Sequence, residues 1–434
     1  MQCSQRTPFN ALRRYRAYRP TDGRIVMTRK RLWIISELFY PEQTSTGYFL
    51  TKIASGLASR WDVHAVAAQP TYSERGIVAP RSEVFEGLQI HRLRSTRFNK
   101  DRLLLRLVNF TTFSLSALFF ALRNFRRGDR VLLVTNPPFL VPIISAVSRW
   151  KGLDSRLLVH DVYPDVLSAT GMLREGSLPY RAIASVFRWS AAGFGQIIVI
   201  GRDMQRRIAK NSGRPVDQIP IITNWGDTDE IRPMTPADNP FVAELGLDGK
   251  VCIQFSGNIG RTHDVQTLIA AAKQLRDDDR VCFLFIGYGG QADRVRSDID
   301  ALQLRNVVFL DRQPRERLSA MLACATAVVI PFNPGMNGIS VPSRMYNVMA
   351  AGTPIIAMAD RDSELAMTVD EFDAGWTIDS GNVAALVALI KRLKDAEGKS
   401  ERDRKAINAR AAVLRNYQLS DVIEKFDNIL AISR

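Results

Sequence analysis

Short hydrophobic runs alternate with longer amphipathic stretches along most of the chain. Runs of about four to six apolar, mostly β-branched residues are typical of strands in a parallel sheet that is covered on both faces. The first series of such runs is Leu32–Ser36, Val63–Ala67, Gln89–Leu93, Val131–Val134, Arg156–His160, Ile197–Ile200 and Ile221–Thr223. The second series is Val251–Ser256, Val281–Ile286, Val307–Leu310, Ala327–Ile330 and Pro354–Ala357.

Helical periodicity fills the intervals between these runs. In Tyr48–Ser59, for example, apolar residues recur at helical spacing and form one stripe. The βαβ pattern is interrupted once, at Asn224–Asn239, where Pro, Asp and Gly cluster as in an interdomain linker. We therefore predict an α/β protein with two doubly wound, Rossmann-like domains that face a central cleft. Ligands in such sheets bind at the carboxyl ends of the strands.

From the two series of strands and the linker, we predict that the first domain spans residues 31–225 and the second spans residues 226–405. Residues 406–434 read as C-terminal helices that could pack back on the first domain. Residues 1–30 form an Arg-rich tail without the apolar core of a signal peptide. Two interpretations of this tail stay open: a disordered basic arm, or a start codon assigned too early, with Met27 as the true start.

One segment departs from the alternation. Residues 103–122, LLLRLVNFTTFSLSALFFAL, are mostly apolar and are flanked by arginines. Arg106 and Asn109 leave too short an uninterrupted stretch to cross the roughly 30 Å core of a bilayer. Two interpretations stay open: a core helix of the first domain, or a helix that lies in a membrane interface with its phenylalanines in lipid.

Composition narrows the class of protein. The chain has 434 residues, of which 46% are hydrophobic, and this excludes a disordered or fibrous protein. Its four cysteines show no metal-binding spacing, so zinc and a disulfide framework are disfavoured. The net charge of +15 divides into +19 on residues 1–225 and −4 on residues 226–434. Such asymmetry suits a nucleic-acid binder, a membrane-surface protein or an enzyme for an anionic substrate.

Two motifs of the first domain follow predicted strands. The loop Phe39–Gly47 opens a helix at Thr46-Gly47, where free backbone N–H groups suit a phosphate. His160-Asp161 stands at the carboxyl end of another strand, and the carboxylate could orient the imidazole ring. His64 and His91 lie on strands without such a setting.

The second domain holds the densest chemistry. Gly257 and Gly260 follow a strand and allow close backbone approach to a ligand, and Arg261 can pair with a diphosphate. The loop at Gly287 lacks the spacing of a dinucleotide fingerprint, which disfavours oxidoreduction. In the stretch 331–354, Arg344 falls in the first turn of a helix. There a cation opposes the helix dipole unless an anion is bound.

These motifs together resemble a known family. Ser-Gly-Asn-Ile-Gly, the Gly-Tyr-Gly loop and Val-Pro-Ser-Arg-Met-Tyr-Asn-Val-Met-Ala-Ala-Gly-Thr-Pro look like the donor domain of GT-B glycosyltransferases of family 4. The likeness is strongest to bacterial exopolysaccharide and O-antigen enzymes, including colanic acid glycosyltransferases. Phe-Tyr-Pro-Glu and His-Asp-Val-Tyr-Pro-Asp fit the same branch, and the likeness runs from about Leu32 to the C-terminus.

The resemblance implies roles for individual residues. Thr46-Gly47 and Ser343-Arg344 would grip the nucleotide diphosphate from opposite walls, His160 would lie by the donor sugar, and Asn347 would face the ribose. The catalytic residues would be His160, Asp161, Arg261 and Arg344. The donor-binding residues would be Thr46, Gly47, Gly257, Asn258, Gly287, Arg312, Gln313, Ile339, Ser340, Ser343 and Asn347.

The chain also departs from the wider family. Two glutamates are usual in the last motif, where this chain has Ile339 and Asn347, and a basic pair is usual where it has Asn258 and His263. Contacts to the donor sugar carried over from the wider family are therefore in doubt.

The reaction implied is transfer of a sugar from a nucleotide diphosphate sugar, with retention, to a saccharide linked to polyprenyl diphosphate. We expect neither a metal ion nor a separate cofactor, since the nucleotide sugar is the co-substrate. The expected partners also include an anionic membrane surface, with the protein peripheral on the cytoplasmic face of the inner membrane. Nucleic acid is not expected, because no basic patch interleaved with aromatics appears. The alternatives are a sugar-nucleotide epimerase of the same fold and a catalytically silent scaffold.

Overall fold

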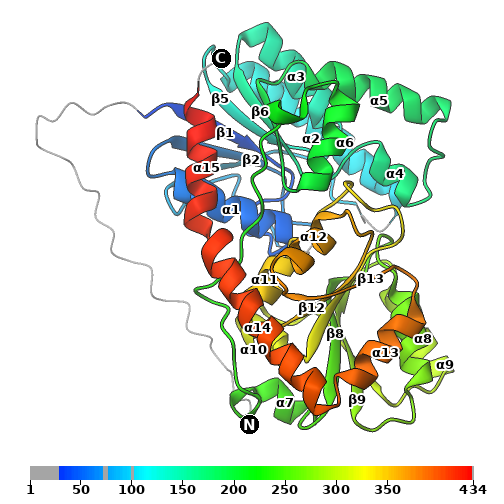
Figure 1. Ribbon diagram of the computed structural model, residues 1–434. Coiled ribbons are helices and arrows are strands. Elements are labelled where there is room, and N and C mark those ends of the chain that lie inside the picture. Colours follow the sequence, from blue (N-terminus) through cyan, green and yellow to red (C-terminus); the bar gives the residue numbers. More distant parts are fainter. Residues whose placement is uncertain (1–28, 72–76, 99–101, 433–434) are drawn as a thin grey trace, which may run out of the picture.

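The computed structural model describes residues 29–71, 77–98 and 102–432. The expected basic tail, residues 1–30, therefore lies almost wholly outside the described residues. The described chain folds into two α/β domains stacked one above the other (Figure 1). This confirms the predicted fold class.

The first domain alternates strands and helices in the predicted way. Its elements are β1 (Arg31–Ile35), α1 (Ser45–Leu57), β2 (Asp62–Ala67), β3 (Ser82–Phe85), β4 (Leu88–Arg92), α2 (Leu103–Asn124), β5 (Arg130–Val134), α3 (Leu140–Lys151), β6 (Asp154–Val159), α4 (Asp165–Ala169), α5 (Leu178–Ala191), β7 (Gln196–Val199) and α6 (Arg202–Ser212).

The second domain repeats the alternation and ends in two long helices. Its elements are α7 (Pro240–Glu244), β8 (Val251–Asn258), α8 (Val265–Gln274), β9 (Val281–Tyr288), α9 (Ala292–Ala301), β10 (Val307–Leu310), α10 (Leu318–Ala323), β11 (Ala327–Pro331), α11 (Arg344–Ala350), β12 (Ile355–Met358), α12 (Glu364–Glu371), β13 (Gly375–Ile378) and α13 (Val383–Arg392), followed by α14 (Ala396–Asn416) and α15 (Leu419–Ala431).

The two sheets share the order of their six parallel strands, and the first has one additional strand. The first has the order β3-β4-β2-β1-β5-β6-β7, in which β3 pairs antiparallel with β4 at one edge. The second is β10-β9-β8-β11-β12-β13, and its described pairings are parallel. The strand order reverses between β1 and β5 and again between β8 and β11. Ligands bind beyond the carboxyl ends of the strands at such reversals.

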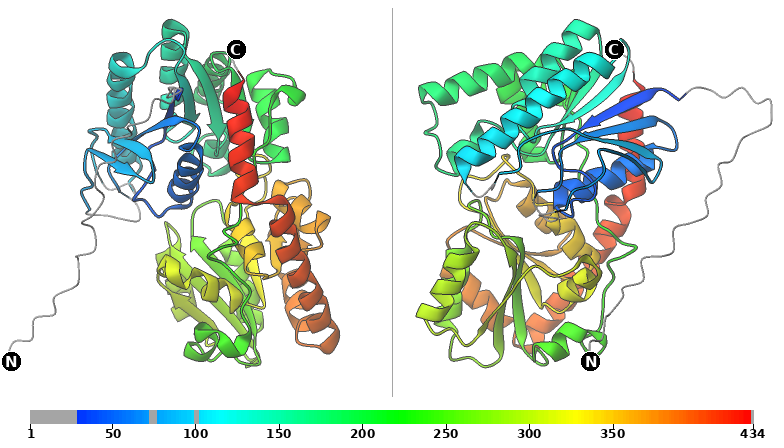
Figure 2. Two further views of the ribbon diagram at one scale, coloured as in Figure 1. Left: turned by 90° about the vertical axis from the view of Figure 1, so that its left-hand side faces the viewer. Right: turned by 180° about the vertical axis from the view of Figure 1, so that it is seen from behind.

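The helices divide between the two faces of the first sheet. Crossovers between parallel strands are right-handed, which places α2, α3 and α5 on one face and α1 on the other. Accordingly α3 packs against both α2 and α5, whereas α1 packs against α15. Figure 2 shows α2, α3 and α5 side by side in the view from behind.

The observed strands differ from the sequence prediction in two details, and α2 shows features of both interpretations of residues 103–122. The predicted strand Ile221–Thr223 is wrong, because only Ile221 forms an isolated bridge, to Val199, and the chain then leaves the sheet. The edge strands β3 and β13 were not predicted. Helix α2 has a buried face, with Phe113 and Ala121 fully enclosed, and an exposed face, with Phe119 at 68% exposure.

The chain passes between the domains twice, and the two passages touch. In the linker, the N–H of Gly226 donates to the carbonyl oxygen of Tyr417 at 3.0 Å. A β-carbon at Gly226 would lie 2.7 Å from the carbonyl oxygen of Tyr346, so only glycine fits there. Beyond Tyr417, α15 runs up the first domain, where Trp61 Nε1 donates to Asp427 at 2.7 Å (Figure 1).

Candidate functional site

The amino-terminal ends of α1 and α11 meet across the cleft. The hydroxyls of Ser45, on α1, and Ser343, which precedes α11, are hydrogen-bonded although the residues are 298 positions apart. Thr44 caps the amino-terminal end of α1, and its side chain accepts a hydrogen bond from the N–H of Gly47. A β-carbon at Gly47 would lie 2.7 Å from the carbonyl oxygen of Glu42, so glycine lets the loop fold tightly onto the helix. This contact places the helix start at Thr46-Gly47 close to Ser343-Arg344, across the cleft.

Arg344 points back beneath the end of β8. Its Nη1 donates to the carbonyl oxygen of Ser256 at 2.7 Å, and Nη2 lies 2.9 Å from Nε2 of His263. Burial lowers the pKa of Arg344 to about 10, so the guanidinium remains charged at neutral pH. Its positive charge therefore lies at the switch point of the second sheet, beside Gly257, whose absent side chain leaves room for it.

His263 is the partner that holds Arg344. Its ring stacks on Phe332 with centroids 5.6 Å apart, and burial and the charge of Arg344 hold its pKa well below the usual range. The imidazole is therefore neutral at pH 7, and its Nε2 accepts a hydrogen bond from the guanidinium of Arg344. Our sequence reasoning noted His263 only as a departure from the family pattern. Its position five residues after Asn258, in the same loop, was the available signal.

His160 and Asp161 follow β6 but face different surroundings. Burial lowers the pKa of His160 to about 4, and its ring lines a small apolar pocket with Phe49 and Ile53. The carboxyl of Asp161 instead pairs with Ser340 of the second domain, while burial raises its pKa. The expectation that Asp161 orients the His160 ring is therefore wrong, because the carboxyl is turned toward the other domain.

The glycine loops bring the ends of β8 and β9 close together. Gly287 has φ +148°, and a β-carbon there would lie 1.9 Å from the carbonyl oxygen of Gly257. Asn258 and Arg261 beyond them are exposed. Among the residues that the structure describes, Arg261 forms no ion pair, so its guanidinium is available to a ligand.

The remaining predicted donor contacts lie in different places. Arg312 is exposed, with its guanidinium 5.9 Å above the Tyr288 ring, and the side chain of Gln313 accepts from Arg317. Ile339 is only 2% exposed, and its carbonyl accepts from the N–H of Val162. The Ile339 side chain is thus turned into the core and does not reach the cleft.

A cluster that the sequence did not reveal ties the domains together behind the predicted phosphate site. The hydroxyl of Tyr48 donates to Asp227 at 2.6 Å, and Arg315 donates to the same carboxylate at 2.6 Å. The Arg315 guanidinium stacks 3.4 Å above the Tyr48 ring. Burial, together with the hydrogen bond to Asp227, raises the pKa of Tyr48. Asn347, expected at the ribose, instead accepts from the backbone N–H of Asp227 at 3.1 Å.

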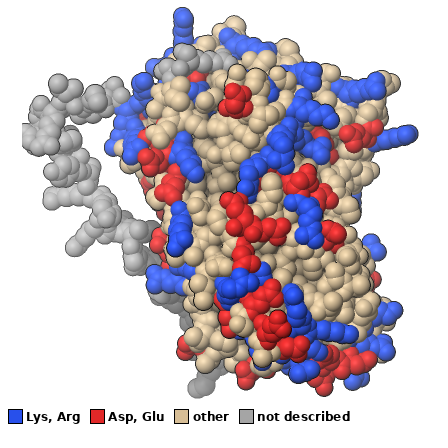
Figure 3. Space-filling view, in the orientation of Figure 1, with Lys and Arg blue, Asp and Glu red and all other residues tan. Residues whose placement is uncertain are grey.

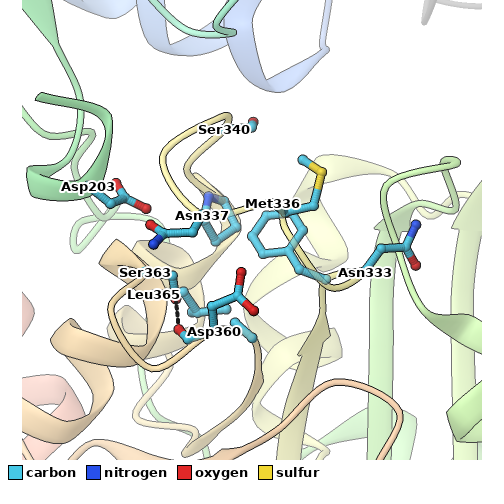
Figure 4. Close-up of a pocket in the computed structure, with 11 residues that line it drawn as sticks. Asp203, Asn333, Met336, Asn337, Ser340, Asp360, Ser363 and Leu365 are labelled. Carbon is cyan, nitrogen blue, oxygen red and sulfur yellow. Dashed lines mark hydrogen bonds between the residues drawn. The ribbon is translucent and has the colours of Figure 1, made fainter. Parts of the chain in front are cut away.

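A pocket lies between the two domains beside the loop that holds Ser340 (Figure 4). Asp203 enters it from α6 of the first domain, opposite Asn337 and Asp360 of the second. Asp203 accepts from the N–H groups of Gly338 and Glu364 at 2.9 and 3.0 Å. The pocket has room for about one water molecule, so the two domains are closely apposed here.

Comparison with known proteins agrees with this geometry. Residues 240–412 match the family of glycosyl transferases group 1. The probable glycosyltransferase WbjE of Pseudomonas aeruginosa is 30% identical over 400 residues, which cover 91% of this chain and 96% of WbjE. The chain belongs to the group 1 glycosyltransferases.

Further relatives of this glycosyltransferase extend the comparison. A putative colanic acid biosynthesis glycosyl transferase, WcaI of Escherichia coli strain K12, is 26% identical, with 82% of this chain and 89% of WcaI covered. Sucrose-phosphate synthase of Thermosynechococcus elongatus has the same fold, with a TM-score of 0.74 and 15% identity over 92% of this chain and 98% of that chain. Anabaena HepE, solved in complex with UDP-glucose, gives a TM-score of 0.69 at 15% identity, with 92% of this chain and 99% of that chain covered. The GT-B fold and transferase class expected from the sequence are confirmed.

Proposed function

We propose that this glycosyltransferase moves a sugar from a nucleotide diphosphate sugar to a lipid-linked saccharide in bacterial polysaccharide synthesis, with retention at the anomeric carbon. The observation that carries the proposal is the meeting of α1 and α11 at Ser45 and Ser343, with Arg344 behind them. Backbone N–H groups at helix starts and a buried guanidinium are donors suited to a diphosphate. HepE, which has the same fold, is solved with UDP-glucose.

The leaving diphosphate gains negative charge as its bond to the sugar breaks. Arg344, held in place by Ser256 and His263, stabilises that charge without reorganising, and exposed Arg261 can approach from the opposite side of the loop. The acceptor hydroxyl attacks from the face that the diphosphate leaves, and its proton passes to the departing phosphate oxygen. These cations supply the neutralising charge, so we expect donor binding without a divalent metal ion.

The acceptor assignment is supported by the distribution of charge. Residues 1–225 carry a net charge of +19 and residues 226–434 carry −4, which suits an anionic acceptor on the first domain. The curated relative WcaI is named for colanic acid biosynthesis. We propose a saccharide on polyprenyl diphosphate, presented at the cytoplasmic face of the inner membrane.

A donor screen tests the proposal. Thermal shift is measured with UDP-, GDP- and TDP-sugars in excess EDTA, and the anomeric configuration of the product is then determined by NMR. We expect one nucleotide class to stabilise the protein and the product to keep the donor configuration. A product with inverted anomeric configuration would exclude the front-face mechanism. Release of an altered sugar in the absence of acceptor would indicate an epimerase.

A further inference from the structure

Three neighbouring helices of the first domain present hydrophobic side chains to solvent. On α2, Phe119 is 68% exposed, and on α5 Leu178 is 81% exposed. Trp150, at the end of α3 between them, is 74% exposed. The other exposed hydrophobic residues on these helices are Leu104, Leu107, Val108, Leu115, Leu122, Val186 and Trp189. We call this set, together with Phe119, Leu178 and Trp150, the apolar face.

The exposed residues of α2 follow a helical spacing of three and four. Leu104, Leu107, Leu115, Phe119 and Leu122 therefore lie along one side of the helix. The opposite side, which carries Phe113, Ala117 and Ala121, is enclosed in the core of the domain. The helix is long and apolar enough to cross a membrane by length and composition, but its buried side packs against α3. A helix that lies flat on a membrane surface accounts for both its exposed apolar side and its side packed in the domain core.

The charged side chains on these three helices are all basic. Helices α2, α3 and α5 contain no Asp or Glu, whereas they carry Arg106, Arg123, Arg149, Lys151, Arg181 and Arg188. The Arg149 guanidinium lies 4.6 Å above the Trp189 ring, so cation and aromatic share the same surface. Figure 3 shows Lys and Arg prominent over the upper domain, whereas acidic and basic residues are intermixed over the middle and lower parts.

We propose that the apolar face docks on the surface of an anionic phospholipid bilayer. Its Leu, Phe and Trp side chains enter the boundary between headgroups and acyl chains, and the surrounding arginines contact headgroup phosphates. A second copy of this chain fits less well, because a two-fold contact would bring cations of one copy against cations of the other. The proposal rests on the proposed function and adds to it the surface by which the enzyme lies on the membrane.

The apolar face reaches the cleft. Helices in a βαβ unit run antiparallel to the strands, so their amino-terminal ends lie at the edge of the sheet where the site is built. Leu104 and Leu178 stand at those ends, and the loop residue Phe139, next to α3, is 39% exposed. Docking therefore places the mouth of the cleft beside the bilayer, within reach of a saccharide on a membrane lipid.

Vesicle flotation with the full chain tests the docking surface. Vesicles of phosphatidylcholine alone are compared with vesicles that also contain phosphatidylglycerol, at low and high salt. We expect binding to the anionic vesicles that weakens with salt. The variant Leu115→Ser/Phe119→Ser/Leu122→Ser should lower the partition coefficient by about tenfold or more, because it removes three inserted side chains.

A matched control lies on α14 of the second domain. Ile407 and Leu414 are 70% and 47% exposed, and Ile407→Ser/Leu414→Ser should leave flotation unchanged. Equal binding by both variants and the wild type would overturn the proposal. A dimer in solution that the triple variant dissociates would also overturn it and would assign the apolar face to self-association.

Thermal shift with the nucleotide sugar separates the two proposals. The triple variant should keep its donor-induced stabilisation, because the substituted residues lie outside the cleft. If the wild type binds the donor but does not float with vesicles, only the proposed membrane docking is excluded. If it floats but does not bind the donor, only the proposed function is excluded.

Discussion

The guanidinium of Arg344 lies 2.9 Å from Nε2 of His263, and the imidazole is the acceptor. Because burial keeps the His263 ring neutral, its remaining proton is on Nδ1. A neutral ring does not cancel the positive charge of Arg344, so that charge remains available to a diphosphate. A second bond, to the carbonyl of Ser256, fixes the guanidinium before any ligand arrives. A preorganised donor costs no reorganisation during reaction, which is the main source of electrostatic catalysis.

Arg344→Ala should lower kcat/KM by about a hundredfold or more, because the loss of one preorganised donor to a developing charge has costs of this order. Steady-state kinetics with the identified donor measures the effect. The control is Arg280→Ala, whose side chain is 69% exposed and which precedes β9, at the end of the strands opposite the candidate site. Similar rates in the two variants would contradict the assigned role.

Stability should fall as the pH decreases from about 6.5 to 4. Burial lowers the pKa of His160 to about 4, so between these pH values the unfolded chain binds a proton that the folded chain does not. The free energy of unfolding then decreases by up to about 1.4 kcal/mol per pH unit for this histidine, and it is insensitive to His160 above pH 7. Urea denaturation of wild type and His160→Gln at several pH values isolates the contribution. Parallel pH profiles would contradict it.

Tyr48→Phe and Asp227→Asn should be energetically coupled. Their hydrogen bond is 2.6 Å long and partly buried, and bonds to charged groups contribute about 1.5–3 kcal/mol. We expect a double-mutant cycle by urea denaturation to give a coupling energy of about 1 kcal/mol or more. Tyr48→Phe combined with Asp248→Asn, at an exposed aspartate, should give additive effects. Additivity in the first cycle as well would show that the contact is absent in solution.

A disulfide between positions 45 and 343 should lock the cleft. The two hydroxyls are in contact, so Ser45→Cys/Ser343→Cys places two thiols within bonding range. Under oxidising conditions we expect turnover to fall by about tenfold or more, because the donor can no longer enter between α1 and α11, and to recover with a reductant. Each single variant should be insensitive to oxidation. Full activity of the oxidised double variant would mean that this contact does not close the site.

The sequence predicted the elements that carry strong periodic signals. Central strands such as β11, AVVIP, are continuous apolar runs, and their positions agree within a few residues. Strand β3 was not predicted because its sequence, SEVF, is short and alternates polar and apolar residues. It lies at an edge of the sheet and is paired on one side only. Strand β13 begins at Gly375, a residue that weakens strand propensity.

The candidate site was predictable only in its local parts. The glycine loops and Arg344 stand out because each is unusual within its own element. Contacts such as Tyr48 with Asp227 join residues 179 positions apart, and no local pattern records them. The direction of the Asp161 carboxyl likewise depends on Ser340 of the other domain, so one strand end could not reveal it.

The bond between Gly226 and Tyr417 limits how the enzyme can open. The two passages of the chain between the domains are fastened to each other at this point, so they define a single narrow axis. Separation of the domains along their long direction would stretch both passages at once, whereas rotation about the axis strains neither. We therefore expect the domains to open by rotation about this axis when substrate enters and product leaves, with the largest displacement farthest from residue 226.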